Sequence, residues 1–517
     1  MKRRDFIQRL AGTGIVLPIA LGFPRLRAFA KSPAGSPFAT LMGAETDNVM
    51  IMLRLAGGND GLNTLVPFTN PAYYQARKQG SADDLSIAAA SVVRVDGSDT
   101  LGLHPRLEPL SDLFSEGKVS VVQNVGYAGQ NLSHFRSTDI WLSGSDPNVY
   151  DNSGWYARYL ETLHPDYPSV LPADPFAIEL GTYLSTTLVG RQNNMGVAVA
   201  DLSYVPGQPD PDPVAATHAG DEEAYVREIA RQSNIFSNAI IAAATRQTTN
   251  RVTYPANNQL ATALSAIARL IASGLGTKLY IVNLNGYDTH TNQLTMQANL
   301  HGALADAVVA FQRDLEAFGL DQRVSTMTIS EFGRRVASNG TGTDHGSAAP
   351  LFVIGSGVRG GFIGNDPNLT DLEGQGNIRM QFDFRQVYAS VLGQWFGATA
   401  EEITPGALPR NFEQLPIFRA LPNAAPVGER ARAAFAVGQN YPNPAMNATV
   451  IPISGVLGAA GGRLALFTTD GRLVHEQGVD VGQSAVTIDT RGLPSGTYVY
   501  ELTSDGLKQG RRMSVVR

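Results

Sequence analysis

Carboxylate and imidazole side chains follow strand-like segments at two places in this chain. In the first place, an apolar run that begins at Lys278 leads through a glycine turn to Asp288 and His290. In the second, the run 325–330 is followed by a glutamate, then by a glycine-rich loop with an aspartate and a histidine. These three residues are Glu331, Asp344 and His345. Because open α/β sheets place ligand and metal sites at strand ends and in the following loops, we expect both segments to contribute to one site.

Two further segments present polar side chains in the same way. Asp60 follows a buried strand expected at 48–56, whereas Ser133 and His134 open a helix after a strand expected at 118–125. Oxygen and imidazole groups in this number suit a divalent cation, with zinc favoured by histidine and magnesium, manganese or calcium favoured by oxygens. Such a cation could polarise a phosphate or sulfate ester, and the helix N-terminus would stabilise negative charge developing on Ser133.

Each of these residues also has an ordinary structural interpretation. An aspartate beside glycines shapes turns, a serine caps a helix, and a glutamate near arginines forms a surface ion pair. These interpretations apply in turn to Asp60 and Asp344, to Ser133, and to Glu331 with Arg334 or Arg335. His290 and His345 are harder to explain in this way, because the chain has only eight histidines and these two end glycine-rich loops.

Length and composition are typical of a globular protein. The chain has 517 residues, of which 43% are hydrophobic and 17% charged, and its formal net charge is −6. No dense run of lysine and arginine follows the first residues, which argues against a nucleic-acid partner. The chain has no cysteine, so any metal must bind oxygen and nitrogen ligands.

The N-terminal residues are typical of an export signal. Lys2–Ile7 carry a twin-arginine motif, an apolar stretch follows over Leu10–Phe23, and Ala28–Ala30 supply small residues for cleavage. The apolar stretch is short for a membrane-spanning helix and contains a proline. We therefore expect a cleaved signal peptide over 1–30, handled by the twin-arginine machinery, then a leader over 31–46. The mature chain is expected to have no transmembrane span and to pass through the periplasm.

Strand-like and helix-like segments alternate through the middle of the chain. Besides the strands named above, a strand is expected at 351–355, and helices are expected at 257–273, 300–318 and 383–396. This alternation predicts an α/β domain over 47–420, with a mostly parallel sheet flanked by helices on both faces.

The composition changes after about residue 420. A linker-like segment, 421–434, precedes short strands separated by turns over 435–517, which predicts a small all-β sandwich. This tail resembles the type A sorting domain of type IX secretion. The matching segments are Gln439–Pro444, Thr469–Arg472, Leu493–Tyr498 and Arg511–Met513. The resemblance implies export by the type IX machinery to the cell surface or the extracellular space.

The segment from Asp47 to Phe396 resembles the bacterial domain-of-unknown-function family 1501. The matching motifs are Leu55–Pro67, Asn124–Tyr127, Ser133–Phe135, Gly286–His290, Thr328–Arg335, Thr343–Gly346 and Asp383–Tyr388. That family is grouped with the alkaline phosphatase and sulfatase superfamily. The resemblance therefore implies an alkaline phosphatase-like fold and a metal-dependent hydrolase of phosphate or sulfate esters, with a small-molecule or polysaccharide substrate.

The superfamily has a recurring order of site residues, and this chain matches it in part. The residues that match are Asp60, Ser133, Asp288 with His290, and His345. There are two departures: Glu331-Phe332 stands where the superfamily has Asp-His, and one residue separates Asp288 from His290 where phosphatases have three. A single metal, an altered metal and a lost activity remain as alternatives. The last of these would make the chain a non-catalytic surface, scaffold or glycan-binding protein.

Overall fold

The described residues fall into two compact units, one within Asp47–Leu421 and the other within Pro422–Arg517. The computed structural model describes residues 46–168, 171–200, 235–419, 435–438, 440–455, 457, 461–468, 472–504 and 507–517. The expected signal peptide, the leader up to residue 45 and the linker over 421–434 lie outside the described residues.

A nine-stranded sheet forms the centre of the first unit in its described part. Its strands are β1 (Val49–Ala56), β5 (Val119–Gly126), β6 (Ala177–Leu180), β7 (Val197–Val199), β8 (Leu279–Asn285), β9 (Val324–Ile329), β12 (Ala349–Ile354), β13 (Gly361–Ile363) and β16 (Phe382–Asp383). The strand order is β13-β5-β12-β9-β1-β8-β6-β7, and β16 pairs with β5. Only β12 runs antiparallel to its neighbours, β5 and β9. The prediction of a mostly parallel sheet is confirmed.

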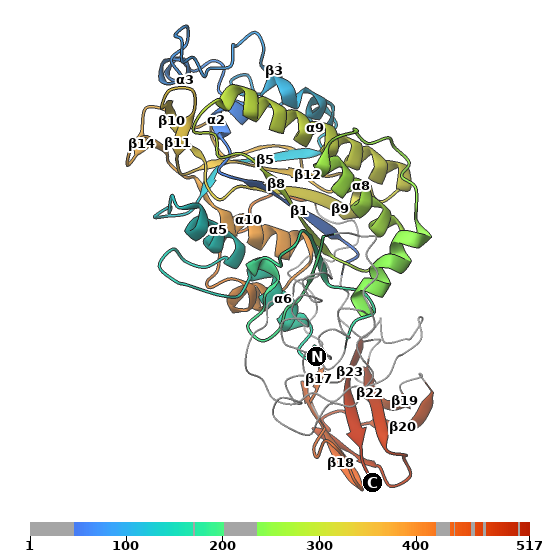
Figure 1. Cartoon of the computed structure of the whole chain (residues 1–517). Helices are drawn as coiled ribbons and strands as arrows, with labels where there is room; N and C mark the ends of the chain where they lie inside the picture. The colour runs from blue at the N-terminus through green and yellow to red at the C-terminus, as the bar shows by residue number, and fades with distance from the viewer. Residues whose placement is uncertain are drawn as a thin grey trace, which may run out of the picture. The chain divides into compact units, whose positions relative to one another are not determined.

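Helices cover both faces of this sheet (Figure 1). One face packs against α8 (Gln259–Ala272) and α9 (Gln293–Phe318), and the other packs against α5 (His134–Ser143), α6 (Trp155–Leu163) and α10 (Phe384–Ser390). The apolar run Val49–Leu53 of β1 is explained by burial on both faces: Ile51 and Leu53 enter the first core, whereas Met50 and Met52 enter the second. A strand buried on both faces needs apolar residues at successive positions, without the alternation of a half-exposed strand.

Shorter elements surround the sheet. They are α2 (Gly61–Thr64), β2 (Leu65–Val66), α3 (Pro71–Ala76), β3 (Val93–Arg94), β4 (Gly102–Leu103), η2 (Pro105–Leu110), α4 (Ser111–Ser115), η3 (Thr186–Leu188), η4 (Asp321–Arg323), β10 (Arg334–Ser338), β11 (Thr343–His345), β14 (Leu372–Glu373), β15 (Asn377–Ile378), η5 (Val391–Trp395) and η6 (Glu402–Ala407). Within the described parts of the chain, none of the helices combines the length and apolar character that a bilayer crossing requires.

The second unit is an all-β sandwich, as predicted. One sheet has the order β17-β18-β21 and the other has the order β20-β19-β22-β23. The strands are β17 (Phe435–Val437), β18 (Ala448–Gly455), β19 (Gly462–Thr468), β20 (Leu473–Val479), β21 (Ala485–Asp489), β22 (Gly496–Ser504) and β23 (Leu507–Val515). Ile451 and Val486 of one sheet share a core with Leu464, Tyr500 and Met513 of the other.

Asp146 fastens the segment after α5 to α10. It accepts hydrogen bonds from Arg385 at 2.5 Å and from Arg410 at 2.6 Å, and the Arg385 side chain is buried. Burial disfavours the charged form of Asp146, but the bonds from the two guanidinium groups outweigh this effect and lower its pKa below the usual 3.8. A carboxyl group whose pKa is lowered in the folded state stabilises the fold at pH values above its usual pKa. This contribution is lost as the pH falls and the group becomes protonated in the folded state.

We therefore expect Asp146→Asn to destabilise the first unit by roughly 1–3 kcal/mol at pH 7. The difference from the wild type should shrink as the pH falls below the usual 3.8 and through the lower pKa of folded Asp146, where the wild-type side chain loses its charge too. Urea unfolding at several pH values measures this, followed by tryptophan fluorescence, since Trp141, Trp155 and Trp395 all lie in this unit. A difference that stays constant with pH would contradict the expectation.

Candidate metal centre

The carboxyl ends of four strands meet at one edge of the sheet. β1 is parallel to β8 and β9, and β5 points the same way as β9 because both are antiparallel to β12. The segments after β5, β8 and β9 carry His134, Asp288 and Glu331, and β11 adds His345 from a hairpin with β10. The structure brings these four side chains together at this edge.

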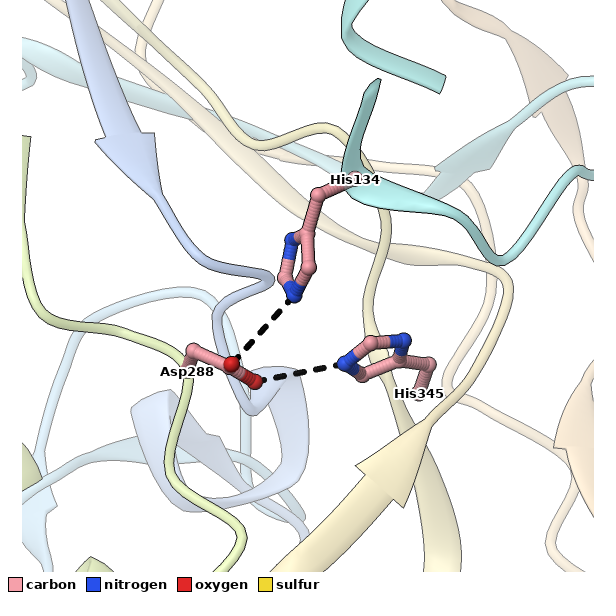
Figure 2. Close-up of side chains that lie close together, drawn as sticks. All are labelled: His134, Asp288 and His345. Carbon is pink, nitrogen blue, oxygen red and sulfur yellow. Dashed lines mark hydrogen bonds and ion pairs between the residues drawn. The ribbon is translucent and has the colours of Figure 1, made fainter. Parts of the chain in front are cut away.

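His134, Asp288 and His345 form the centre of the group, which we call the His/Asp cluster (Figure 2). The Nε2 atom of His134 lies 3.4 Å from Oδ2 of Asp288, and the Nε2 atom of His345 lies 3.2 Å from Oδ1. One nitrogen or oxygen from each residue lies within 4.8 Å of the other two. This spacing allows all three atoms to contact one cation.

The far side of each imidazole is held by an acceptor. His345 Nδ1 donates to the carbonyl of Leu132 at 2.8 Å, and His134 Nδ1 donates to Oε1 of Glu331 at 2.9 Å. A neutral imidazole that donates through Nδ1 presents a lone pair at Nε2. Burial lowers the pKa of His345 below the usual 6.5, although the bond to Leu132 opposes the shift, so its neutral form is favoured. In the neutral form of each imidazole, the Nε2 lone pair faces the Asp288 carboxylate.

His290 joins the His/Asp cluster from its solvent side. Its Nε2 atom lies 3.0 Å from Nε2 of His345 and 3.2 Å from Oδ1 of Asp288. Its Nδ1 atom lies 3.6 Å from Oδ1 of Asp344, which also pairs with Arg335 at 3.5 Å. The His290 side chain is 43% exposed, which is more than the side chains of His134 and His345. Asp344 therefore lies outside the centre, behind His290.

Asp288 is held ionised by its surroundings. Arg334 donates to its Oδ1 atom at 2.6 Å. Partial burial disfavours the carboxylate, but the hydrogen bond from Arg334 and the positive charge of its guanidinium outweigh burial and lower the pKa of Asp288 to about 2. Asp288 thus carries a full negative charge at neutral pH, toward which a cation would be attracted.

Arg334 connects the segments that surround the site through hydrogen bonds of its buried guanidinium. Its buried guanidinium donates to Asp288 and to the backbone carbonyls of Gly57, Gly58, Tyr287 and Thr343. Sequence reasoning treated Arg334 only as a surface partner of Glu331, so this role was missed. Strand alternation could have indicated that Arg334 is buried, because Arg334 and Val336 are two positions apart and both occupy the buried face of β10.

Glu331 is not a surface residue, and the alternative interpretation, a surface ion pair with Arg334 or Arg335, is not observed. The residue is only 3% exposed, and its Oε1 atom accepts from the backbone N–H of Gly57 and from His134. Arg54 lies 4.0 Å away, whereas Arg334 and Arg335 pair with aspartates. Glu331 therefore supports the orientation of His134 and does not belong to the three central groups.

The structure does not bring Asp60 into the His/Asp cluster. Asp60 caps α2 by accepting from Leu62 N–H, and Arg77 donates to both of its carboxylate oxygens, at 2.5 and 2.8 Å. Gln293 donates to Oδ2 as well. Asp60 is 1% exposed, so these bonds leave it no open side for a metal. Its turn and capping role, an alternative from the sequence, is the one observed.

Ser133 occupies the N-cap position of α5 but does not cap it with its side chain. Its backbone N–H donates to Asn131, its carbonyl accepts from the N–H of Ser137, and its hydroxyl makes no capping hydrogen bond. Ser133 is exposed and directly precedes His134. The hydroxyl is therefore accessible from solvent at the start of the helix.

Phe332 forms an apolar wall of the site. Its ring centre lies 4.9 Å from that of His134 and 4.5 Å from that of His345. Gly58 makes room for this ring, because it has a φ of +81° and a Cβ atom there would overlap the Phe332 ring. The position that departs from the superfamily pattern thus packs against two of the imidazoles and offers no ligand.

Similarities to solved structures are weak. A protein in the alkaline phosphatase superfamily from Vibrio parahaemolyticus is 10% identical, with a TM-score of 0.31 and coverage of 95% of this chain and 88% of that one. A protein from a Bacteroides thetaiotaomicron glycosaminoglycan-metabolism locus is 11% identical, with a TM-score of 0.33 and coverage of 86% and 90%. Latent PorU from Porphyromonas gingivalis is 21% identical, with a TM-score of 0.13, over 16% of this chain and 9% of that one. At TM-scores this low, no individual residue of this chain can be matched to a residue of these structures.

Family models give a clearer result, although no curated protein matches the chain. A model described as a secretion system C-terminal sorting domain matches residues 439–516, which supports export toward the cell surface or the extracellular space. A second model matches residues 47–405, most of the chain and the whole His/Asp cluster. The chain therefore belongs to the family described as a protein of unknown function, DUF1501.

Proposed function

We propose that this chain is an exported hydrolase that holds a divalent cation at His134, Asp288 and His345 and cleaves phosphate or sulfate esters. The observation that carries the proposal is that two imidazoles, each held at Nδ1 by an acceptor, place their Nε2 atoms beside one ionised carboxylate. Lone pairs and negative charge that face one another repel, and a cation among them converts the repulsion into attraction. The anchored Nδ1 atoms are the arrangement that orients metal-binding histidines in proteins.

The donor set favours zinc among the four candidate ions. Two imidazoles and one carboxylate, with an open side toward solvent, correspond to the three protein ligands of catalytic zinc sites. Magnesium and calcium prefer oxygen ligands, which only Asp288 supplies at the centre. His290 lies on the open side, where it is placed to bind the cation or to accept a proton.

The chemistry divides between a bound cation and the protein. A bound cation would polarise the ester and lower the pKa of water. The protein contributes the fixed geometry, through Glu331 behind His134 and Arg334 behind Asp288. Ser133, with a hydroxyl free of capping bonds at the start of α5, is the proposed nucleophile, and His290 is the proposed proton acceptor.

Metal analysis and hydrolysis assays test this proposal. We expect about one zinc per chain, and turnover of 4-nitrophenyl phosphate or 4-nitrophenyl sulfate that a chelator abolishes and zinc restores. His345→Ala should weaken zinc binding by more than about 100-fold, because loss of an outer-shell partner alone costs about 10–100-fold. His164→Ala is the matched control, since His164 stacks on Phe176 at the end of α6 and should leave both properties unchanged. A wild-type chain with neither metal nor turnover would contradict the proposal.

A second candidate is a zinc-holding surface protein without turnover, which binds glycans. One observation favours it: in the described part of the chain no side-chain base donates to or accepts from the Ser133 hydroxyl. Zinc binding together with glycan-array binding, and no hydrolysis of either ester, would select this candidate.

A further inference from the structure

A second polar cluster, formed by Asp60, Arg77, Thr289, Gln293 and Thr343, lies behind the His/Asp cluster. Each of these residues is at most 2% exposed, so their polar groups depend on one another for hydrogen bonds. They come from the loop after β1, the end of α3, the start of α9, the segment after β8 that carries Asp288, and β11, which carries His345. The proposed ester chemistry uses none of them directly.

Gln293 connects the segment that carries Asp288 to the strand that carries His345. Its amide oxygen accepts from the hydroxyl of Thr289 at 3.2 Å and from the hydroxyl of Thr343 at 2.6 Å. Thr289 directly follows Asp288, and Thr343 precedes His345 by two positions. The backbone reinforces the same junction, because Thr343 N–H donates to the Thr289 carbonyl at 3.3 Å. The Gln293 side chain of α9 therefore bridges the segment that contains Thr289 and the strand that begins at Thr343.

Asp60 and Arg77 fix which way the Gln293 amide faces. A carboxylate only accepts hydrogen bonds, so the Nε2 group of Gln293 must turn toward Asp60, at 2.5 Å. The amide oxygen is then left for the two threonines. Arg77 holds the carboxylate through two hydrogen bonds, which prevents Asp60 from rotating toward another donor.

We propose that Gln293 is a positioning residue of the His/Asp cluster, and that Asp60 with Arg77 orients it. The inference rests on the proposed cation site. Without the amide bridge, the segment of Asp288 and His290 is no longer fixed against that of His345, and the three ligand atoms lose their preorganisation. This also assigns a role to Asp60, whose carboxylate acts through Gln293 and not on a metal.

Zinc affinity of the full chain, measured by chelator competition, is the primary readout. Gln293→Leu keeps a similar volume but removes the bridge, and it should weaken zinc binding by about 10–100-fold. Thr343→Val removes one hydroxyl without changing the shape and should weaken binding by a smaller factor. If both act through the same bridge, the double variant should bind zinc no more weakly than Gln293→Leu alone. Thr343→Val also keeps the test valid where Gln293→Leu fails to fold.

Asp314→Asn is the matched control for a purely structural effect. Asp314 is fully buried on the same helix, α9, and accepts from Asn250, Tyr254 and the N–H groups of Arg251 and Val252. It should lower the unfolding midpoint but leave zinc affinity unchanged. Gln293→Leu and Thr343→Val chains that bind zinc as tightly as the wild type would overturn the inference while leaving the cation site intact. A wild-type chain that binds no zinc would instead overturn the proposed function.

Discussion

Replacing Arg334 with leucine is expected to lower the free energy of unfolding of the first unit by about 3–5 kcal/mol. The Arg334 side chain is fully buried, and its guanidinium donates to four backbone carbonyls and to Asp288. Leucine fills part of the volume but donates no hydrogen bond, so several buried carbonyls lose a partner at once. The cost is large because those carbonyls belong to three separate segments, the loops after β1 and β8 and the strand β11.

Arg335→Leu supplies the matched control. Arg335 is the next residue, but its side chain is partly exposed and pairs with Asp344 and Gln375 near the surface. A surface pair of this kind contributes about 0–1 kcal/mol. Urea unfolding followed by tryptophan fluorescence measures both variants in the unit that contains all three tryptophans. Equal losses for the two arginines would show that the buried contacts of Arg334 carry no special weight.

The sheet was predictable because its strands are buried on both faces. A continuous apolar run such as Val49–Leu53 of β1 predicts a central strand whatever lies around it. The start of α9 was not predictable in the same way: the helix was expected from residue 300 but begins at Gln293. Its first turns carry buried glutamines that bond to Asp60, and hydrophobic periodicity cannot detect a face that is buried but polar.

The candidate site was predictable to the extent that strand ends determine it. Asp288 follows β8, and His345 lies on the β10–β11 hairpin that follows the parallel strand β9, so topology brings both to one edge. Asp60 follows a strand of the same edge, yet Arg77 takes both of its oxygens. That pairing depends on where α3 packs, which the local sequence around Asp60 does not contain. Which side chains face the centre of the site and which ones hold them in place is thus decided by tertiary packing.

Asp288 combines strong electrostatic influence with little structural weight. Its side chain is 48% exposed, so its removal leaves no large cavity. Its pKa of about 2 means that it is ionised throughout the neutral range, and the lone pairs of His134 and His345 face it. In Asp288→Asn the size is kept and the charge is lost, which isolates the electrostatic contribution of this residue.

We expect Asp288→Asn to weaken zinc binding by more than about 100-fold, beyond the effect of losing an outer-shell partner. The unfolding midpoint of the metal-free chain should fall much less than in Arg334→Leu, since Asp288 is the half-exposed end of its ion pair with the buried Arg334 and solvent screens its charge. Chelator competition measures the affinity, and urea unfolding in the presence of chelator measures the stability. The contrast with Arg334→Leu is the decisive comparison, because the arginine supports the fold whereas the aspartate faces the cation. An Asp288→Asn chain that unfolds as easily as Arg334→Leu, or that retains wild-type zinc affinity, would assign Asp288 to the scaffold and remove the charge on which the cation site depends.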